Sequence, residues 1–132
     1  MKKENKEHYT PYELFNIECG EGWYKCIQPC LDYINDYNKD KSEDEQIYIF
    51  QIKEKWGELC FYTSFTTPEL DKLIEQAEDE CSKTCEICGS KDDVGMRTTG
   101  WLTTLCRNCM QKMKDHNKWI SYADNKVYEF IN

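Results

Sequence analysis

The chain has 132 residues, a net charge of −8 and nine cysteines. This length is typical of one domain, and 39% hydrophobic with 14% aromatic residues describes a folded chain rather than a disordered one. No apolar run approaches the roughly 18 residues of a membrane span, and residues 1–8 lack the apolar stretch of a signal peptide. We therefore expect no membrane insertion and no export. In a chain that is not exported, cysteines are expected as free thiols or metal ligands and not as disulfides.

The charge is unevenly distributed along the chain. Residues 1–83 carry 19 acidic and 10 basic side chains, a net charge of −9, whereas residues 84–132 carry 6 acidic and 7 basic ones, a net charge of +1. The acidic part repels phosphate backbones, which argues against general nucleic-acid binding there. It favours a basic partner surface or imitation of a nucleic acid, although an acidic surface that serves only solubility is the simpler interpretation. This division predicts an acidic α+β body at 1–83 and a metal-binding finger at 84–132, integrated into one domain.

The first predicted elements are a leader and a helix. Residues 1–17 form a loose leader whose aromatic end is expected to pack on the body. From Trp23 to Tyr37 the apolar residues recur with the spacing of an amphipathic helix. Pro29 lies inside this pattern and is expected to kink the helix or mark its beginning. The polar stretch 38–45 predicts a loop. The apolar residues of the leader are Tyr9, Tyr12, Leu14, Phe15 and Ile17.

A β-hairpin and a second helix follow. The β-branched and aromatic runs 46–53 and 59–65, with a glycine in the connection, predict two paired strands. Thr66 is the expected N-cap of the next helix, with Glu69 completing a capping box. This helix extends to Cys81 and has an acidic outer face.

The strongest motif consists of two cysteine pairs, Cys85-x2-Cys88 and Cys106-x2-Cys109, separated by 17 residues. Two thiolates with this spacing can face one ion, and two such pairs complete a tetrahedron of soft, charged ligands. The pattern has the spacing of a structural zinc site. Since four protein thiolates leave no position for water, we expect one Zn²⁺ ion with a structural and not a catalytic role.

The residues around the second pair predict the type of finger. The stretches 94–99 and 101–105 around Gly100 predict a short hairpin, and the apolar spacing of Met110, Met113 and Trp119 predicts a helix after Cys109 to about residue 118. A knuckle, a hairpin and a helix in this order are typical of a treble-clef finger, whereas a zinc ribbon would lack the helix.

An HNH-type nuclease is disfavoured. It would need histidines beside the metal to activate water, and no histidine lies between the cysteine pairs. We interpret His116 as an exposed residue at the end of the predicted helix. No combination of base, nucleophile and oxyanion donor is recognisable elsewhere, so we expect no enzyme.

Five cysteines lie outside the motif: Cys19, Cys26, Cys30, Cys60 and Cys81. Cys26 and Cys30 are one helical turn apart, so they could form a second metal site together with Cys19, and this alternative stays open. Burial as small hydrophobic residues is the better interpretation for Cys26, Cys30 and Cys81, because they fall on apolar helix faces.

The candidate partner-binding residues are Lys55, Trp56, Trp101 and Arg107. Trp56 stands at the tip of the first predicted hairpin, where an aromatic side chain can anchor a partner. We favour the alternative that Trp56 folds back over the sheet as a lid. Trp101, beside Gly100, can likewise seal the finger against the body.

Four blocks occur in order along the chain, with the sequences GEGWY at 20–24, QIKEKWGELCFY at 51–62, TCEICG at 84–89 and GWLTTLC at 100–106. Over residues 18–109 they resemble a family of small phage and prophage zinc-finger proteins with the blocks K-E-K-F-G-x-L-R-F-Y and T-C-x-x-C-G…G-W-x-x-T-L-C. Trp56 replaces the usual Phe, and Cys60 replaces a basic residue, which removes a possible anion contact. The resemblance implies a bacterial host cytoplasm and no particular activity. Residues 85–118 alone are also similar to the N-terminal zinc domain of Clp-type unfoldases, which serves protein–protein contacts.

The sequence therefore predicts an α+β fold with a helix, a β-hairpin and a helix, followed by a treble-clef-like or ribbon-like zinc finger. The favoured function is non-enzymatic binding of a host protein, such as a defence component. The first alternative is a regulatory zinc finger that binds nucleic acid. The second is a small enzyme or a binder of a small signalling ligand. A nucleic-acid interface would use the basic residues Arg97, Arg107, Lys112, Lys114 and Lys118.

Overall fold

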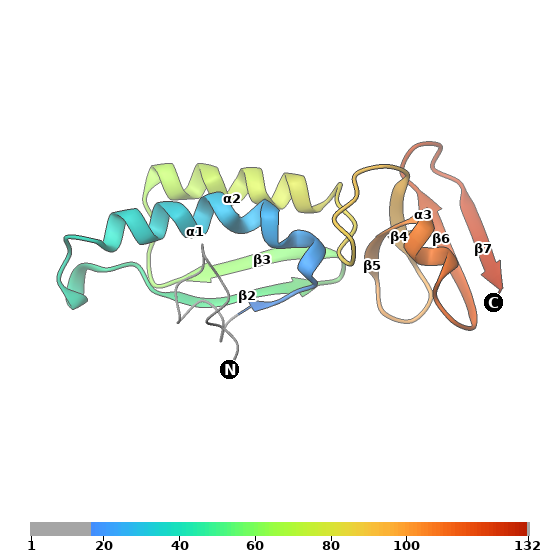
Figure 1. Ribbon diagram of the computed structural model, residues 1–132, viewed down its shortest axis with the longest axis horizontal. Coiled ribbons are helices and arrows are strands. Elements are labelled where there is room, and N and C mark those ends of the chain that lie inside the picture. Colours follow the sequence, from blue (N-terminus) through green and yellow to red (C-terminus); the bar gives the residue numbers. More distant parts are fainter. Residues whose placement is uncertain (1–16, 132) are drawn as a thin grey trace.

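The computed structural model describes residues 17–131 and shows a mixed fold of helices and strands, as the sequence predicts. Two helices and a sheet occupy one end of an elongated molecule, and a second sheet occupies the other end (Figure 1). We call residues 17–83 the body and residues 84–131 the finger. Among the described residues, no helix is both long and apolar enough to cross a membrane.

Helix α1 (Tyr24–Asn38) follows a single 3-10 turn (Glu21–Trp23) and continues without interruption through Pro29. Of the two alternatives for Pro29, the helix start is therefore wrong, because the helix begins five residues earlier. The expected loop after α1 contains a second 3-10 turn (Glu43–Glu45). The buried face of α1 matches the predicted apolar stripe and includes Ile27, Cys30, Leu31 and Ile34.

The body contains a three-stranded sheet with the order β1-β2-β3. Strand β1 (Ile17–Glu18) pairs in parallel with β2 (Ile49–Lys55), and β2 pairs antiparallel with β3 (Glu58–Thr63). The hairpin loop is shorter than expected. It consists only of Trp56 and Gly57, because Lys55 and Glu58 still pair. Both loop residues have positive φ, +55° and +81°, as a two-residue type I′ turn requires.

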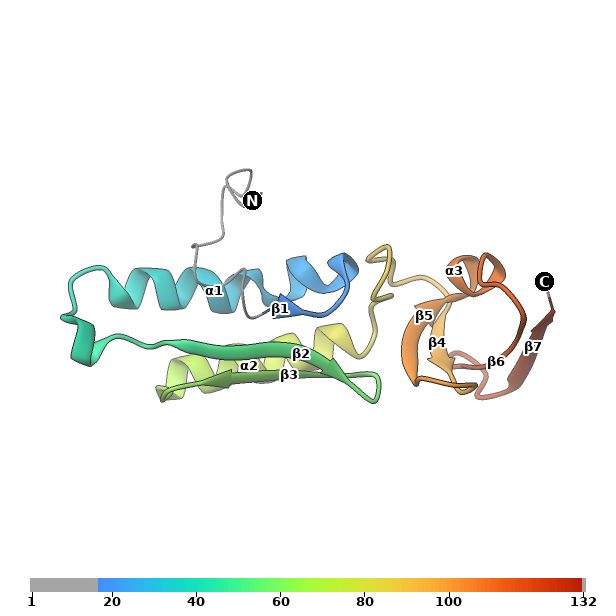
Figure 2. The same ribbon diagram turned by 90° about the horizontal axis from the view of Figure 1, so that it is seen from below.

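Helix α2 (Pro68–Cys81) lies beside α1 over one face of this sheet, as the view from below shows (Figure 2). Its N-cap is Thr67, whose side chain accepts a hydrogen bond from the Leu70 N–H at 3.1 Å. The predicted cap at Thr66 is wrong by one position. Ile17 packs against the core between helices and sheet, while the other apolar residues of the predicted leader lie outside the described residues.

The finger contains an antiparallel sheet with the order β5-β4-β6-β7 and one short helix. The hairpin predicted around Gly100 is present as β4 and β5. A second hairpin, β6 and β7, completes the sheet. The elements in chain order are β4 (Val94–Arg97), β5 (Thr103–Cys106), α3 (Arg107–Gln111), β6 (His116–Ser121) and β7 (Val127–Ile131). The buried residues of the finger form a second core of Cys85, Val94, Leu105, Cys106, Cys109, Met110 and Trp119.

The helix predicted to extend to about residue 118 ends at Gln111, so this prediction is wrong beyond that residue. Trp119 lies in β6 and not on the helix. It is fully buried, and its Nε1 donates to the Leu105 carbonyl at 2.8 Å. His116 is exposed, as expected, but it begins β6 and pairs with Glu129 at 2.9 Å. Pairing of β6 with both β4 and β7 overrides the local helical spacing.

Candidate metal centre

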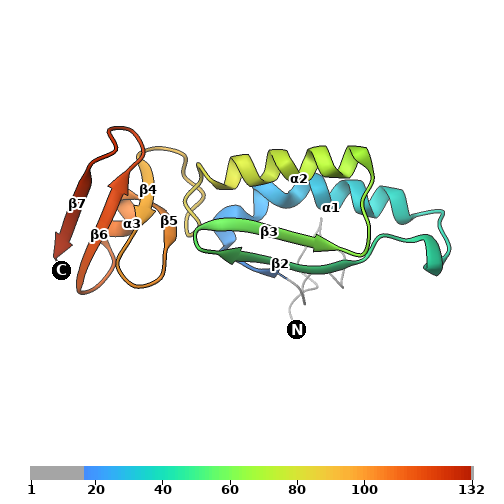
Figure 3. The same cartoon turned by 180° about the vertical axis from the view of Figure 1, so that it is seen from behind.

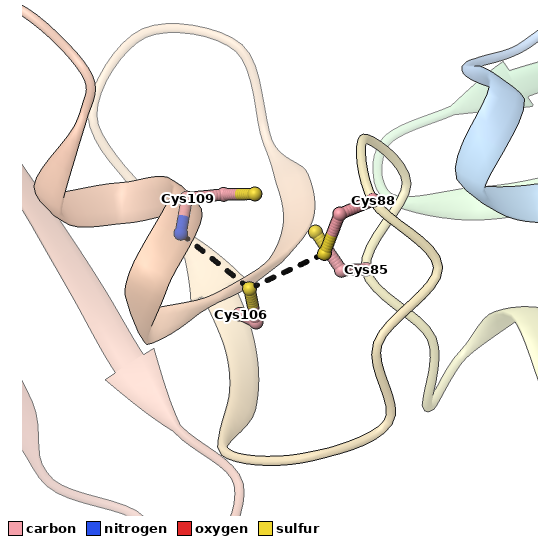
Figure 4. Close-up of side chains that lie close together, drawn as sticks. All are labelled: Cys85, Cys88, Cys106 and Cys109. Atoms are coloured by element: carbon pink, nitrogen blue, oxygen red, sulfur yellow. Dashed lines mark hydrogen bonds between the residues drawn. The ribbon is translucent and has the colours of Figure 1, made fainter.

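The four cysteines of the motif come together at one point of the finger (Figure 4). Their sulfur atoms all lie within 4.8 Å of one another. Cys88 Sγ and Cys106 Sγ are 3.7 Å apart and join the two pairs directly. Among residues 17–131 this is the only group of three or more such side chains placed to hold a metal ion.

The first cysteine pair lies on a tight loop between α2 and β4. The Gly89 N–H donates to the Cys85 carbonyl at 2.9 Å, and the Cys85 N–H donates to the Ser90 carbonyl at 2.8 Å. Gly89 has a φ of +81°, which side-chain-bearing residues rarely adopt. The loop buries Cys85 and leaves Cys88 exposed. Both sulfur atoms face the second pair (Figure 4).

The second pair lies where β5 passes into α3. Cys106 is the N-cap of α3, and its Sγ accepts a hydrogen bond from the Cys109 N–H at 3.4 Å. A two-residue spacing at a helix start therefore brings both sulfur atoms to one side of the helix (Figure 4). Burial raises the pKa of Cys106, and the N–H donor of Cys109 opposes this effect only in part.

The surroundings of Cys85 favour a thiolate. Burial alone would raise the pKa of Cys85, but hydrogen bonds from backbone N–H groups of Cys88, Cys106 and Ile87 hold it below the ordinary value. Burial and the neighbouring thiols raise the pKa of Cys109. Such closely spaced thiolates repel one another, and a bound cation removes that repulsion.

The first cysteine loop is also fastened to the body. The Gly22 N–H donates to the Glu86 carbonyl at 2.8 Å, and the Gly20 N–H donates to Glu86 Oε2 at 2.9 Å. Trp23 is fully buried, and its Nε1 donates to the Thr84 carbonyl at 2.8 Å. The segment before α1 therefore holds the loop that carries Cys85 and Cys88.

Gly22 approaches this loop too closely to carry a side chain. A Cβ there would lie 2.2 Å from the Cys85 carbonyl oxygen and 2.6 Å from the Gly89 nitrogen. We expect Gly22→Ala to lower the free energy of unfolding by about 1–3 kcal/mol, because backbone atoms must move apart. Urea unfolding measures the change, with exposed Glu21→Ala as the control. If Gly22→Ala were as stable as Glu21→Ala, the close approach of Gly22 to the cysteine loop would be contradicted.

A second contact joins the turn of the body hairpin to the finger, and Figure 3 shows this turn facing β5. Thr104 Oγ1 donates to the Gly57 carbonyl at 2.9 Å. Glu54 accepts hydrogen bonds from the Gly57 N–H at 2.7 Å and from Trp101 Nε1 at 2.9 Å. The expected contact of Trp101 with the body is therefore present. Its partner Glu54, and the contact between Thr104 and Gly57, could not be named from the sequence, because these residues lie far apart in the chain.

Trp56 does not form the lid that the sequence favoured. Its side chain is 65% exposed at the tip of the hairpin, with Lys55 Nζ 4.9 Å from its ring centroid. The left-handed backbone at Trp56 belongs to the tight turn and does not return the side chain to the sheet. Trp101 joins finger to body through its Nε1, yet it stays 62% exposed.

Arg107 is held by contacts within the finger. Its Nε pairs with Asp93 Oδ2 at 2.6 Å, and its guanidinium lies 4.6 Å and 5.0 Å from the ring centroids of Tyr128 and Trp119. Arg97 donates to Asn117 Oδ1 at 2.9 Å. Both arginines therefore stabilise the finger. Asp93 offsets the charge of Arg107, whereas Arg97 bonds a neutral amide and keeps its charge.

The other cysteines lie outside the metal centre. Cys30 and Cys81 are buried, as predicted, whereas Cys26 is only half-buried and lines a cavity. Cys19 and Cys60 are also half-buried. The second metal site considered for Cys19, Cys26 and Cys30 is not assembled in the described part of the chain.

Comparison of the chain with models of protein families, with curated proteins and with solved structures found no match. The four sequence blocks nevertheless meet in space. The GEGWY block contacts the TCEICG block through Gly22 and Glu86. The turn of the second block contacts the GWLTTLC block through Gly57 and Thr104. The blocks therefore correspond to the contact between body and finger.

Proposed function

We propose that this chain is a non-enzymatic protein that is stabilised by one structural Zn²⁺ ion and acts by binding another protein. The observation that carries the proposal is the cluster of four sulfur atoms within 4.8 Å. Zinc in a tetrahedron of thiolates, with Zn–S distances of about 2.3 Å, places its ligands about 3.8 Å apart. The 3.7 Å between Cys88 and Cys106 fits this spacing. Thiolates suit zinc well, and four of them leave no site for a reacting water.

The order of elements supports a treble-clef finger with an additional hairpin. The cysteine loop 85–88 is followed by the β4–β5 hairpin and then by α3, which carries the second pair. A ribbon would lack α3. The β6–β7 hairpin extends the sheet and places Tyr128 and Phe130 against Trp119. The metal and this small core together hold the finger folded.

Two exposed tryptophans form the surface that we propose for partner binding. Trp56 and Trp101, here called the tryptophan pair, are 65% and 62% exposed. Glu54 links the two positions, because it accepts hydrogen bonds from Trp101 Nε1 and from the N–H of Gly57, the residue after Trp56. The turn that carries Trp56 is fixed by its contact with Thr104, and Trp101 is fixed by Glu54. Rigid exposed tryptophans are favoured as anchors in protein interfaces, because little conformational entropy is lost on binding.

The backbone conformation at Trp56 also supports a binding role for this residue. A non-glycine residue in the left-handed region costs about 1–2 kcal/mol, and asparagine tolerates this region better. An Asn-Gly loop is the favoured sequence for a type I′ turn. The chain instead places an exposed tryptophan there, at φ +55°. Strain of this kind is characteristic of positions kept for a function.

The charge of the body suggests a partner with a basic surface. Residues 1–83 carry a net charge of −9, and the outer face of α2 is lined with carboxylates. A basic rim on the partner would speed association through electrostatic attraction. The resemblance to phage and prophage proteins supports a host protein in the bacterial cytoplasm as this partner, with a defence component as one example.

Nucleic-acid binding has less support. Arg107 is paired with Asp93, so an interface would depend mainly on Arg97, Lys112, Lys114 and Lys118. The acidic body would oppose it. Salt-dependent binding of DNA or RNA that is lost in a Lys112→Glu, Lys114→Glu variant would favour this alternative over a protein partner.

Substitution of Trp56 separates binding from stability. We expect Trp56→Asn to weaken partner binding about 30-fold, the effect of a hot-spot residue worth about 2 kcal/mol. Its melting temperature should not fall, because asparagine relieves the strained backbone. The zinc-loaded chain is used to capture a partner from bacterial host lysate, and the Kd of the purified complex is then measured for each variant.

Phe50→Ala is the matched control, because Phe50 is 63% exposed at the opposite end of β2. It should leave the Kd unchanged. A captured protein that binds Trp56→Asn as tightly as the original chain would show that the tryptophan pair is not the interface. Equal losses for Trp56→Asn and Phe50→Ala would lead to the same conclusion.

A further inference from the structure

Cys88 is the exposed member of the cysteine cluster, whereas Cys85, Cys106 and Cys109 are buried. Two cavities, of about 600 Å³ and about 300 Å³, both reach Cys88. Cys85 and Cys109 line neither of them. The function proposed above uses neither cavity. A small molecule can therefore approach the cluster at Cys88.

The smaller cavity also reaches Cys106, whose Sγ lies 3.7 Å from Cys88 Sγ. A polar cavity admits water and polar molecules of similar size, such as hydrogen peroxide. One cavity thus opens a sulfur atom of each cysteine pair to the same small molecule. Apart from the two cysteines, its wall consists of the polar residues Ser90, Asp92, Asp93, Arg107, Asn108 and Gln111.

The loop that carries Cys88 is joined to the tryptophan pair. The Glu86 N–H donates to the Thr104 carbonyl at 2.9 Å, and Thr104 Oγ1 donates to the Gly57 carbonyl in the turn of Trp56 at 2.9 Å. Trp101 itself belongs to the finger. Since so small a finger is expected to need its ion to stay folded, loss of the ion would disassemble the tryptophan pair.

We propose that Cys88 is an oxidation site, at which a hydroperoxide converts Cys88 and Cys106 into a disulfide and thereby switches off the surface formed by the tryptophan pair. This inference rests on the proposed zinc site and adds a means of regulation to it.

The reaction has two steps, and it starts from thiolates because metal ligands of this kind are deprotonated. The Cys88 sulfur attacks one oxygen of hydrogen peroxide, so that an S–O bond forms, the O–O bond breaks and hydroxide leaves. Cys88 is then a sulfenic acid. The Cys106 thiolate attacks the Cys88 sulfur, an S–S bond forms, the S–O bond breaks and a second hydroxide leaves.

Two thiolates are thereby oxidised to a disulfide, and one peroxide molecule is reduced to two hydroxide ions. Only Cys85 and Cys109 remain as thiolates. The site has then lost half of its ligands and can no longer hold its ion in a closed tetrahedron.

The test is brief treatment of the full zinc-loaded chain with hydrogen peroxide, followed by disulfide mapping and by measurement of bound zinc. We expect a Cys88–Cys106 disulfide, loss of the zinc ion, and loss of amide protection in β4 and β5. Dithiothreitol with added zinc should reverse all three changes. Oxidation that begins at the half-buried Cys26 while the ion stays bound would overturn the proposal.

The zinc content of the untreated chain tests the proposed function separately. An untreated chain that holds no zinc would overturn the proposed function together with this inference. A zinc-loaded chain that keeps its ion in peroxide would overturn only the inference.

Cys88→His is the informative variant, because three thiolates and one imidazole also form a structural zinc site. It lacks the exposed thiolate, so peroxide should release its zinc at least about tenfold more slowly than in the original chain. Cys60→Ser is the matched control, since it removes a half-buried cysteine outside the cluster and should release zinc at the original rate. Equal rates in Cys88→His and the original chain would contradict the role of Cys88. The mapping of the unmodified chain decides the question even where Cys88→His fails to bind zinc.

Discussion

A Cys88→Ser variant is expected to lose its zinc and unfold the finger, while the body stays folded. Three of the seven buried residues in the finger core are the proposed metal ligands Cys85, Cys106 and Cys109. Without the ion, the remaining apolar residues are too few to hold residues 84–131 in one fold. Zinc binding in small fingers contributes on the order of 10 kcal/mol, which exceeds what this core supplies. Cys88 is exposed, so the substitution acts through the metal and not through packing.

Hydrogen exchange followed by mass spectrometry measures the result. Amides of β4 to β7 should lose their protection, whereas those of α1 and β2 keep most of it. Cys60→Ser, which replaces a half-buried thiol of β3, is the control and should bind one zinc ion with unchanged protection. A Cys88→Ser finger that remains protected, with or without metal, would refute a folding role for zinc.

Trp23 should be the most sensitive position of the body. Its side chain is fully buried in the first core, and its Nε1 bonds the carbonyl of Thr84, next to Cys85. Trp23→Ala removes a large buried side chain, so the free energy of unfolding should fall by about 3–5 kcal/mol. Trp23→Phe keeps most of the packing but leaves the Thr84 carbonyl unpaired, at a cost of about 1–3 kcal/mol. These losses are large, because the total free energy of unfolding of a domain is only about 5–15 kcal/mol.

Trp56→Ala is the matched tryptophan control, since Trp56 is exposed. Its stability should change by no more than about 0.5 kcal/mol. Urea unfolding of the zinc-loaded chains measures all three variants. If Trp23→Phe were as stable as the original chain, the hydrogen bond to Thr84 would contribute nothing to the joining of body and finger.

The cluster of four cysteines could be predicted because its members repeat a short local spacing. Two residues separate Cys85 from Cys88 and likewise Cys106 from Cys109, and two such pairs have the spacing of a zinc site. Helices α1 and α2 could also be predicted, since each buries a stripe with helical periodicity. These features depend on neighbours in the sequence.

Apart from the expected role of Trp101, the contact between body and finger could not be predicted, because it depends on residues distant in the chain. Gly22 and Glu86 meet across more than 60 residues, and nothing local to either marks the other. Strand β6 could not be predicted from its neighbours in the sequence either. Its alternation of buried Asn117, Trp119 and Ser121 is a strand pattern, but the apolar spacing from Met110 to Trp119 also fits a helix. Only its pairing with β4 and β7 decides between them.

X-ray absorption spectroscopy of the purified chain is the decisive test of a structural zinc site. We expect one zinc ion per chain, with four sulfur ligands at about 2.3 Å and no nitrogen or oxygen ligand. Zinc bound by fewer than four sulfur atoms together with a water would contradict a purely structural site. A different metal, or a folded chain that holds none, would contradict the claim altogether.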